Sequence, residues 1–250
     1  MMEGSRVLRN SQIIILGICI AAATIVSSVI LSQGFLKVMK SSREVITVTG
    51  SAHKDIRSDY IVWKCSFAGV GADLGTAYRQ LNRDLSRVKQ YLDSKGVKEE
   101  EETISQISII TVYKKNDSGK DTNEILGYRL EQTVEIRSGE VDKITGISRQ
   151  SSELINEGIE FVSGAPEYFY TKLDDLKIEM LASASKNAKQ RAENMVKATG
   201  NRIGLMRSAR MGVFQITPLN STEVSDWGVN DTSSLEKKVI AVVSASFAIE

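Results

Sequence analysis

The feature that most constrains this chain is an uncharged apolar run near its N-terminus, Ile13–Leu31. As an α-helix these residues would span about 28 Å, close to the roughly 30 Å of a bilayer's hydrocarbon core. A secretory signal peptide would have a shorter apolar region, about 7–15 residues, and then a small-residue cleavage site. Ala21–Ala23 are small, but further apolar residues follow them. The run predicts an uncleaved transmembrane anchor over residues 13–36, with a cleaved signal peptide as the alternative.

The charges beside the anchor do not fix its orientation. Basic residues flank it on both sides, Arg6 and Arg9 before it and Lys37, Lys40 and Arg43 after it. The positive-inside rule is therefore nearly balanced, and long C-terminal domains translocate largely regardless of such charges. We expect a cytoplasmic segment over residues 1–12, a polar tether over 37–44 and one folded domain over 45–250.

The composition of the chain is that of a globular protein. Hydrophobic residues make up 42% and charged residues 25%, which argues against disorder. The net charge is only +1, with acidic and basic residues interspersed along the chain. A nucleic-acid-binding protein usually carries a basic excess on one face, so we expect no nucleic-acid partner.

Alternation of apolar and polar residues predicts most of the strands. It is clearest over Tyr60–Val70, Gly127–Arg137 and Lys238–Ile249. Further strands are predicted over Val45–Thr49 (ending at Gly50), Ile104–Tyr113, Ile159–Val162 and Ile203–Ile216. The polar turn Lys114–Asn123 predicts a hairpin.

Helical spacing of apolar residues predicts three helices. They cover Ala77–Leu92, Val141–Glu157 and the longest segment, Leu173–Thr199, where alanines recur at four-residue spacing. Because strands pair locally and helices interrupt them in blocks, we predict an α+β fold. Its antiparallel sheets would pack against one long and two shorter helices, after the single N-terminal transmembrane helix.

The sequence predicts no catalytic, cofactor-binding or metal-binding residues. His53 is the only histidine, and no other histidine or cysteine lies at ligand-like spacing from it. We expect it on the surface, in a turn between strands. Cys65 lies among apolar residues of a strand, which favours a buried thiol, and Cys19 lies in the anchor. No serine lies in a nucleophile elbow and no phosphate-binding loop is present.

Four other groups have a structural and a functional interpretation. Glu99–Glu102 is typical of a solvated loop, although it could bind a cation; Asp174 and Asp175 suit the first turn of a helix. Lys186, Lys189, Arg191 and Lys197 indicate a solvated helix face or a contact with anionic lipids. Tyr168–Tyr170 could pack in the core or form a ligand or oligomer contact. Ser221–Ser234, with the isolated Trp227, is predicted to be a mobile loop.

Five segments carry a resemblance to a known family. They are VITVTGSA at Val45–Ala52, the turn Ile56–Tyr60 into IVWKCSF, GYRLEQTVEIRSGEVDKI at Gly127–Ile144, AKQRAENMVKATGNRIG at Ala188–Gly204, and the terminal KKVIAVVSASFAI. Together they resemble the SIMPL-domain family, which includes bacterial periplasmic and outer-membrane immunogenic proteins. The leader ending in LSQGF is similar to the membrane-anchored branch of that family.

The resemblance implies an exported α+β domain of the cell envelope, assembled in some members into ring- or channel-like oligomers. Stress-related roles are attributed to bacterial relatives, and no catalytic residues are implied. It favours a single-pass inner-membrane protein with a periplasmic C-terminal domain. We therefore expect a non-enzymatic envelope protein that acts by self-association or by binding an envelope protein. The alternative is a monomeric module that binds a small molecule or peptide.

Overall fold

A computed structural model describes residues 16–35 and 44–250. Residues 16–35 form a helix, Leu16–Phe35, that is long and apolar enough to cross a membrane. A signal sequence would have the same properties. The other ends of the predicted anchor (13–15 and 36), the segment 1–12 and the tether up to residue 43 lie outside the described residues.

The rest of the described chain alternates strands and helices. In order they are β1 (Val45–Arg57), β2 (Tyr60–Gly71), α2 (Leu74–Ser94), the short 3-10 helix η1 (Glu99–Glu101), β3 (Glu102–Ile104), β4 (Ser108–Lys115), β5 (Asp121–Ser138), α3 (Val141–Gln150), α4 (Glu153–Asn156), β6 (Glu160–Ser163), β7 (Glu167–Phe169), α5 (Leu173–Lys197), β8 (Ile203–Met211), β9 (Gln215–Pro218) and β10 (Glu236–Ile249). The predicted α+β class, with antiparallel sheets and an N-terminal apolar helix, is confirmed.

These elements form two compact units. Unit 1 contains residues 1–52, 181–212 and 242–250, and unit 2 contains residues 53–180 and 213–241. One sheet has the strand order β1-β10-β8, with β9 paired to another part of β10. The other sheet has the order β3-β5-β2-β6, with β4 paired to β5 and β7 to β2.

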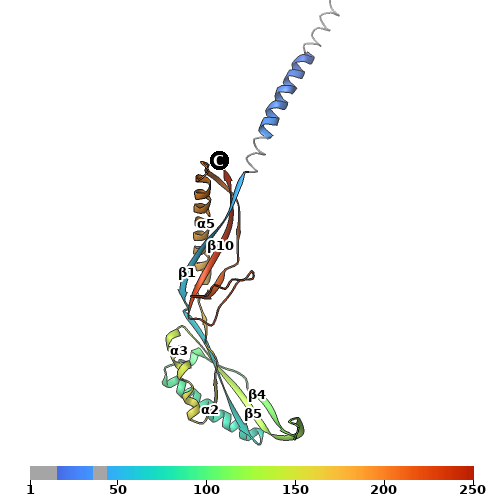
Figure 1. The fold of residues 1–250 in the computed structure, drawn as a ribbon. Coiled ribbons are helices and arrows are strands. Elements are labelled where there is room, and N and C mark those ends of the chain that lie inside the picture. The colour runs from blue at the N-terminus through green and yellow to red at the C-terminus, as the bar shows by residue number, and fades with distance from the viewer. Residues whose placement is uncertain (1–15, 36–43) are drawn as a thin grey trace, which may run out of the picture. The chain divides into compact units, whose positions relative to one another are not determined.

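The core of unit 1 is built from small residues. Helix α5 lies along β1 and β10 (Figure 1), and Ala188 and Ala192 pack there with Val48, Ala245 and Phe247. Gly50 makes the close approach possible, because an added Cβ would clash with the backbone of Ala184 and Ala188. The alanines predicted at four-residue spacing are therefore the contact face of the helix.

The core of unit 2 is built from large residues. Trp63, Phe67 and Ile61 on β2 are almost fully buried, and Val134 and Ile136 on β5 lie in the same cluster. Helix α2 covers them. Gly69 lets the first turns of α2 approach β2, because an added Cβ would lie 2.5 Å from Ala77 O and Leu81 N. Aromatic and branched side chains fill the remainder of this core.

Two predicted elements differ from the structure near Gly50 and residue 151. Strand β1 continues past Gly50 to Arg57, so this glycine marks a helix contact and not a strand end. The predicted helix Val141–Glu157 is divided into α3 and α4. Ser148 and Ser151 donate their hydroxyls to the carbonyls of Thr145 and Ser148, and such bonds compete with regular helix.

Two predicted strands are each divided as well. The predicted strand Ile104–Tyr113 is divided into β3 and β4, with residues 105–107 between them. Here the Ser105 hydroxyl accepts from the N–H of Thr133, while the Ser105 N–H donates to Thr133 O. The side chain thus replaces a backbone group in the pairing with β5. In Ile203–Ile216, residues 212–214 separate β8 from β9. The β4–β5 hairpin is confirmed, with Ile109 opposite Leu130 and Val112 opposite Gly127.

Candidate functional site

Strand β8 is the edge strand of its sheet and is unusually exposed. Leu205, Met206 and Met211 have 76%, 57% and 61% of their surface accessible. β8 pairs with β10, placing Met211 opposite Val243 and Ala209 opposite Ala245. The N–H and C=O groups on the outer side of such a strand, together with exposed apolar side chains, favour pairing with another chain.

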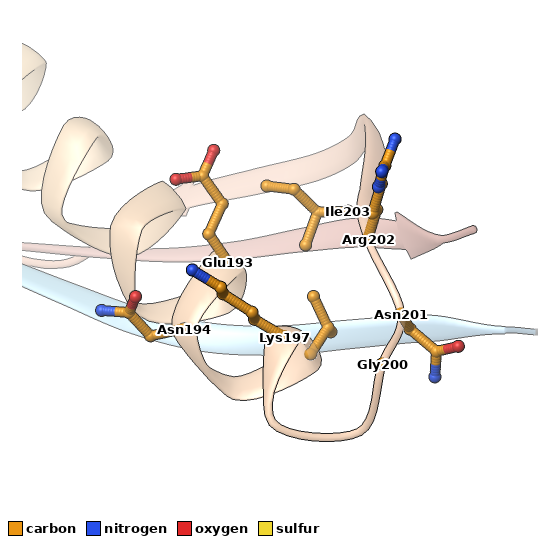
Figure 2. Close-up of a pocket in the computed structure, with 8 residues that line it drawn as sticks. Glu193, Asn194, Lys197, Gly200, Asn201, Arg202 and Ile203 are labelled. Carbon is orange, nitrogen blue, oxygen red and sulfur yellow. The ribbon is translucent and has the colours of Figure 1, made fainter.

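A hollow lies where α5 ends and β8 begins, and we call it the α5–β8 pocket. Its volume is about 540 Å³, within the range typical of ligand sites. It is lined by Glu193, Asn194, Val196, Lys197, Gly200, Asn201, Arg202 and Ile203. Figure 2 shows Glu193 and Lys197 on the last turns of α5 and the Ile203 side chain pointing toward the helix from the strand side. The side chains of Lys197 and Arg202 point away from each other.

The charges of this pocket are mainly positive. Among the described residues, neither Lys197 nor Arg202 has a salt-bridge partner, whereas Glu193 pairs with Lys189 at 3.7 Å. The buried Val196 and the half-buried Ile203 give it an apolar floor. An apolar group next to an acidic group would suit this combination.

The segment from Leu219 to Leu235, which we call the Trp227 loop, has a defined conformation. The Gln215 side chain donates to Ser225 O at 2.7 Å and accepts from the N–H of Val229 at 2.8 Å. Ile216 also exchanges backbone bonds with Val229 and Asp231. The turn-rich character predicted for Ser221–Ser234 is confirmed, and the structure adds the hydrogen bonds that anchor the loop.

At the tip of this loop Trp227 is 93% exposed, and Val224 is 73% exposed. Glu223 and Asp226 beside them are exposed as well. A tryptophan so exposed on an ordered loop is unusual, because its large apolar area is normally covered. The loop therefore presents an apolar side chain with acidic neighbours.

Lys237 fastens the base of the Trp227 loop. It is 3% exposed, and its Nζ donates to Tyr168 O at 2.6 Å and to Asp231 O at 2.5 Å. Burial lowers the pKa of Lys237, and the Asp231 carboxylate partly opposes this. Burial would raise the pKa of Asp231, but hydrogen bonds from Ser233 and Ser234 and the Lys237 charge lower it.

A small cavity of about 100 Å³ lies beside Lys237. It is lined by Ile56, Tyr168, Phe169, Tyr170, Leu173, Ile216, Asn230, Thr232 and Lys237. This volume is well below the roughly 300 Å³ of a typical small-molecule site. The lysine ammonium already bonds two carbonyls, so its arrangement suits the fastening of chain segments better than ligand binding.

The histidine and cysteines singled out in the sequence do not come together. His53 is exposed, but it lies within β1 and not in a turn. Cys65 is 1% exposed and donates to Val134 O at 3.6 Å. Burial raises the pKa of the Cys65 thiol to about 12, and the charge of Glu102 adds to this. Cys19 is exposed in the N-terminal helix. Within residues 16–35 and 44–250, no three histidine, cysteine, aspartate or glutamate residues gather as a metal site.

The acidic run Glu99–Glu102 is only partly a solvated segment. Glu99 and Glu100 are exposed in η1, whereas Glu101 accepts from the Ser138 hydroxyl at 2.5 Å. Glu102 is half-buried, and this burial raises its pKa. Its Oε2 atom is buried without a hydrogen-bond partner among the described residues.

The remaining singled-out residues have ordinary positions. Asp174 and Asp175 lie in the first turn of α5, as predicted. Lys186, Lys189, Arg191 and Lys197 are exposed along it. Tyr168 is a core residue, 8% exposed, with its hydroxyl 3.1 Å from Thr145 Oγ1. It is not available as a contact surface, so the core interpretation of this aromatic residue is the correct one.

Sequence reasoning missed Gln215 and Lys237, the two residues that hold the Trp227 loop. Both are polar residues next to apolar strands, and each is buried: Gln215 is 6% exposed and Lys237 3%. The only available signal was Trp227 itself, an aromatic residue within an otherwise polar segment.

Comparison with protein families gives one result that agrees with the resemblance seen in the sequence. The family SIMPL, described as a protein of unknown function (DUF541), matches residues 46–247. This match includes every strand and helix that follows the N-terminal helix, apart from the ends of β1 and β10. Comparison with curated proteins gives no match. The chain therefore belongs to the SIMPL family.

Proposed function

We propose that this protein is a membrane-anchored, non-enzymatic component of the cell envelope that acts by self-association or by binding an envelope protein. The observation that carries the proposal is the exposed edge strand β8. Leu205 and Met206 are apolar and more than half exposed there. Contact with another chain would remove this apolar surface from water, which is favourable. A bound strand or apolar surface would cover them.

A second exposed apolar surface supports the same function. On the β4–β5 hairpin, Ile109, Ile125 and Leu126 are 59%, 50% and 65% exposed. The register shift between Val112 and Tyr113 places Leu126 at a bulge. Figure 1 shows β4 and β5 ending together in this hairpin. The bulge and the lysines at the end of β4 are features that protect an edge strand from strand pairing, so we expect a partner to cover the apolar side chains and not to extend the sheet.

The non-enzymatic part of the proposal rests on the nucleophiles. Cys65 is buried with its pKa raised to about 12, so its thiolate is not formed near neutral pH. His53 is exposed and has no hydrogen-bonded side-chain partner among the described residues. The periplasmic location and a stress-related role remain predictions from the resemblance. Protease accessibility in spheroplasts tests the location.

The mass of the folded part in solution tests the proposal. Both cores lie within residues 44–250, so we expect the chain from Ser41 onward to fold by itself. Light scattering behind a sizing column should give a defined multimer. Leu205→Lys should dissociate it, whereas Ile178→Lys, at an equally exposed residue of α5, should not. A monomer at all concentrations, with no captured envelope protein, would contradict the proposal.

A monomeric ligand-binding module is the second candidate, favoured by the α5–β8 pocket. Its volume of about 540 Å³ suits a small molecule or a peptide side chain. A ligand that binds only the folded state raises its melting temperature by mass action. A monomer whose melting temperature rises with a ligand, and whose rise is lost in Arg202→Glu, would favour this function over self-association.

A further inference from the structure

We infer that the Trp227 loop of one copy inserts into the α5–β8 pocket of a second copy. This inference rests on the proposed self-association and names its contact. The first argument is the exposure of Trp227, which is 93% accessible. Tryptophan is among the residues that contribute most to protein interfaces, and it does so when it fills a pocket on the partner.

The loop is prepared for binding before any partner arrives. Gln215 fixes Ser225 and Val229 on either side of the tip, and Lys237 fixes Asp231 at its base. A loop held in this way loses little conformational entropy on association. Preorganisation of this kind distinguishes the loop from an ordinary polar connection.

The pocket has the volume and the apolar surface that an indole ring requires. Its volume of about 540 Å³ exceeds that of one side chain, and Val196 and Ile203 form an apolar floor. Leu205 continues the apolar surface along β8 and is 76% exposed. Val224, which is 73% exposed on the same loop as Trp227, would cover apolar surface of this kind.

The charges on the two surfaces are opposite. Glu223 and Asp226 flank the exposed apolar residues of the loop, and both are exposed. Lys197 and Arg202 lie at the pocket without salt-bridge partners among the described residues. Opposite charges at an interface orient the partners and exclude incorrect ones. This complementarity is the reason for choosing a second copy as the occupant.

The loop and the pocket are different surfaces of the chain, so each copy carries one of each. Two copies can exchange both contacts as a two-fold dimer, or each copy can bind two different neighbours. In the second case the assembly closes into a ring or extends as a filament.

Cysteine cross-linking of the full chain in liposomes tests the contact. Two differently tagged populations, both with Cys19→Ser, carry Asp226→Cys and Asn201→Cys respectively. Cys65 is buried and its raised pKa leaves it unreactive. Mild oxidation should give a product that carries both tags. Asp226→Cys paired with Gln90→Cys, an exposed position on α2, is the matched control and should give none.

Charge reversal tests the same contact without cysteines. Asp226→Lys and Arg202→Asp should each weaken association by roughly tenfold, and the two together should restore it. Trp227→Ala should abolish association. At concentrations where both proteins are monomeric it should leave the melting temperature unchanged, because the side chain packs against little of its own chain. Iodide quenching reports the ring directly. Trp63 is fully buried, so iodide quenches only the fluorescence of Trp227. The extent of this quenching should decrease as copies associate.

The outcomes separate this inference from the proposed function. A multimer that persists in Trp227→Ala and gives no mixed cross-link would overturn the inference and leave self-association intact. A chain that stays monomeric in the membrane would remove both. A mixed cross-link that is as strong in the Gln90→Cys control would show non-specific collision and would also overturn it.

Discussion

Units 1 and 2 both pack one helix against two strands of a sheet, but they fill the contact differently. In unit 1, α5 meets β1 through Gly50 and a row of alanines, Ala184, Ala188 and Ala192. In unit 2, α2 meets β2 at Gly69, and large side chains such as Trp63 fill the remaining core. In both units a glycine on the strand lets the helix approach closely. The core beside this contact consists of small side chains in unit 1, which we call the thin core, and of large side chains in unit 2, which we call the thick core.

The difference has a functional side. Because the core of unit 1 consists of few side chains, α5 covers β1 and β10 while β8 remains exposed. The larger core of unit 2 buries one face of β2, which carries Ile61, Trp63, Cys65 and Phe67. Interaction surfaces lie where side chains are not packed in the protein's own core. In unit 1 these surfaces are the edge strand β8 and the α5–β8 pocket.

Trp63→Ala should have the largest effect on stability. Trp63 is fully buried, and its Nε1 donates to Ser163 Oγ at 3.1 Å. Removing an indole from such a site costs about 3–5 kcal/mol. Urea unfolding followed by circular dichroism measures it, and Trp63→Phe should retain most of the stability. A loss in Trp63→Ala no larger than that of Phe247→Ala in unit 1 would contradict the distinction between thick and thin cores.

Ala188→Leu should have the next largest effect, because it acts on the thin core. Ala188 is 0% exposed and faces the backbone at Gly50. Adding three carbons there forces α5 away from β1 and costs about 1–3 kcal/mol or more. Ala182→Leu, at an exposed position of the same helix, should change stability by less than about 0.5 kcal/mol. Equal effects of the two substitutions would exclude the close helix contact.

Local patterns were sufficient to predict most of the fold. The alternation over Gly127–Arg137 gave the correct buried face, with Leu130, Val134 and Ile136 inside. The alanine spacing in α5 gave its contact face correctly. The interpretation of Gly50 failed because its cause lies in Ala184 and Ala188, which are distant in sequence and adjacent only in the folded chain.

The candidate site was much less predictable than the fold. Lys237 and Gln215 are buried polar residues, and their role depends on the carbonyls and N–H groups of segments that meet only after folding. Neither residue belongs to a motif. The exposure of Trp227 was also unpredictable, since an isolated tryptophan is more often buried. Such sites depend on tertiary contacts that a single sequence does not display.

Lys237→Met should have a moderate effect that is confined to the Trp227 loop. The ammonium holds Tyr168 O and Asp231 O, and its loss leaves both carbonyls without this donor. We expect the free energy of unfolding to fall by about 1–2 kcal/mol. The loss is no larger because the cost of burying the lysine charge already offsets part of what its two hydrogen bonds contribute. Hydrogen exchange should increase over residues 219–235, whereas Lys238→Met on the more exposed neighbour should leave it unchanged.

The pH dependence of stability should change in the same variant. The pKa of Lys237 is lowered in the folded protein, so between that pKa and the ordinary 10.5 the unfolded chain binds more protons. Stability contributed by this group therefore rises with pH across that window. The rise should be absent in Lys237→Met. Identical slopes for the two proteins above neutral pH would show that burial does not perturb this lysine.

The outer faces of the sheets provide the smallest expected effect and extend the comparison of the units. In unit 1 the outer face carries hydroxyls, with Thr47 and Ser246 2.8 Å apart. In unit 2 it carries charges, with Arg129 bonded to Glu131 at 2.6 Å and to Glu160 at 2.5 Å.

These ion pairs are partly exposed, so a double-mutant cycle of Arg129→Ala and Glu160→Ala should give a coupling of about 0.5 kcal/mol. The coupling should decrease in 1 M salt, because salt screens exposed charges. A coupling of several kcal/mol would mean that this face is shielded from water, as it would be if a partner or a second copy covered it.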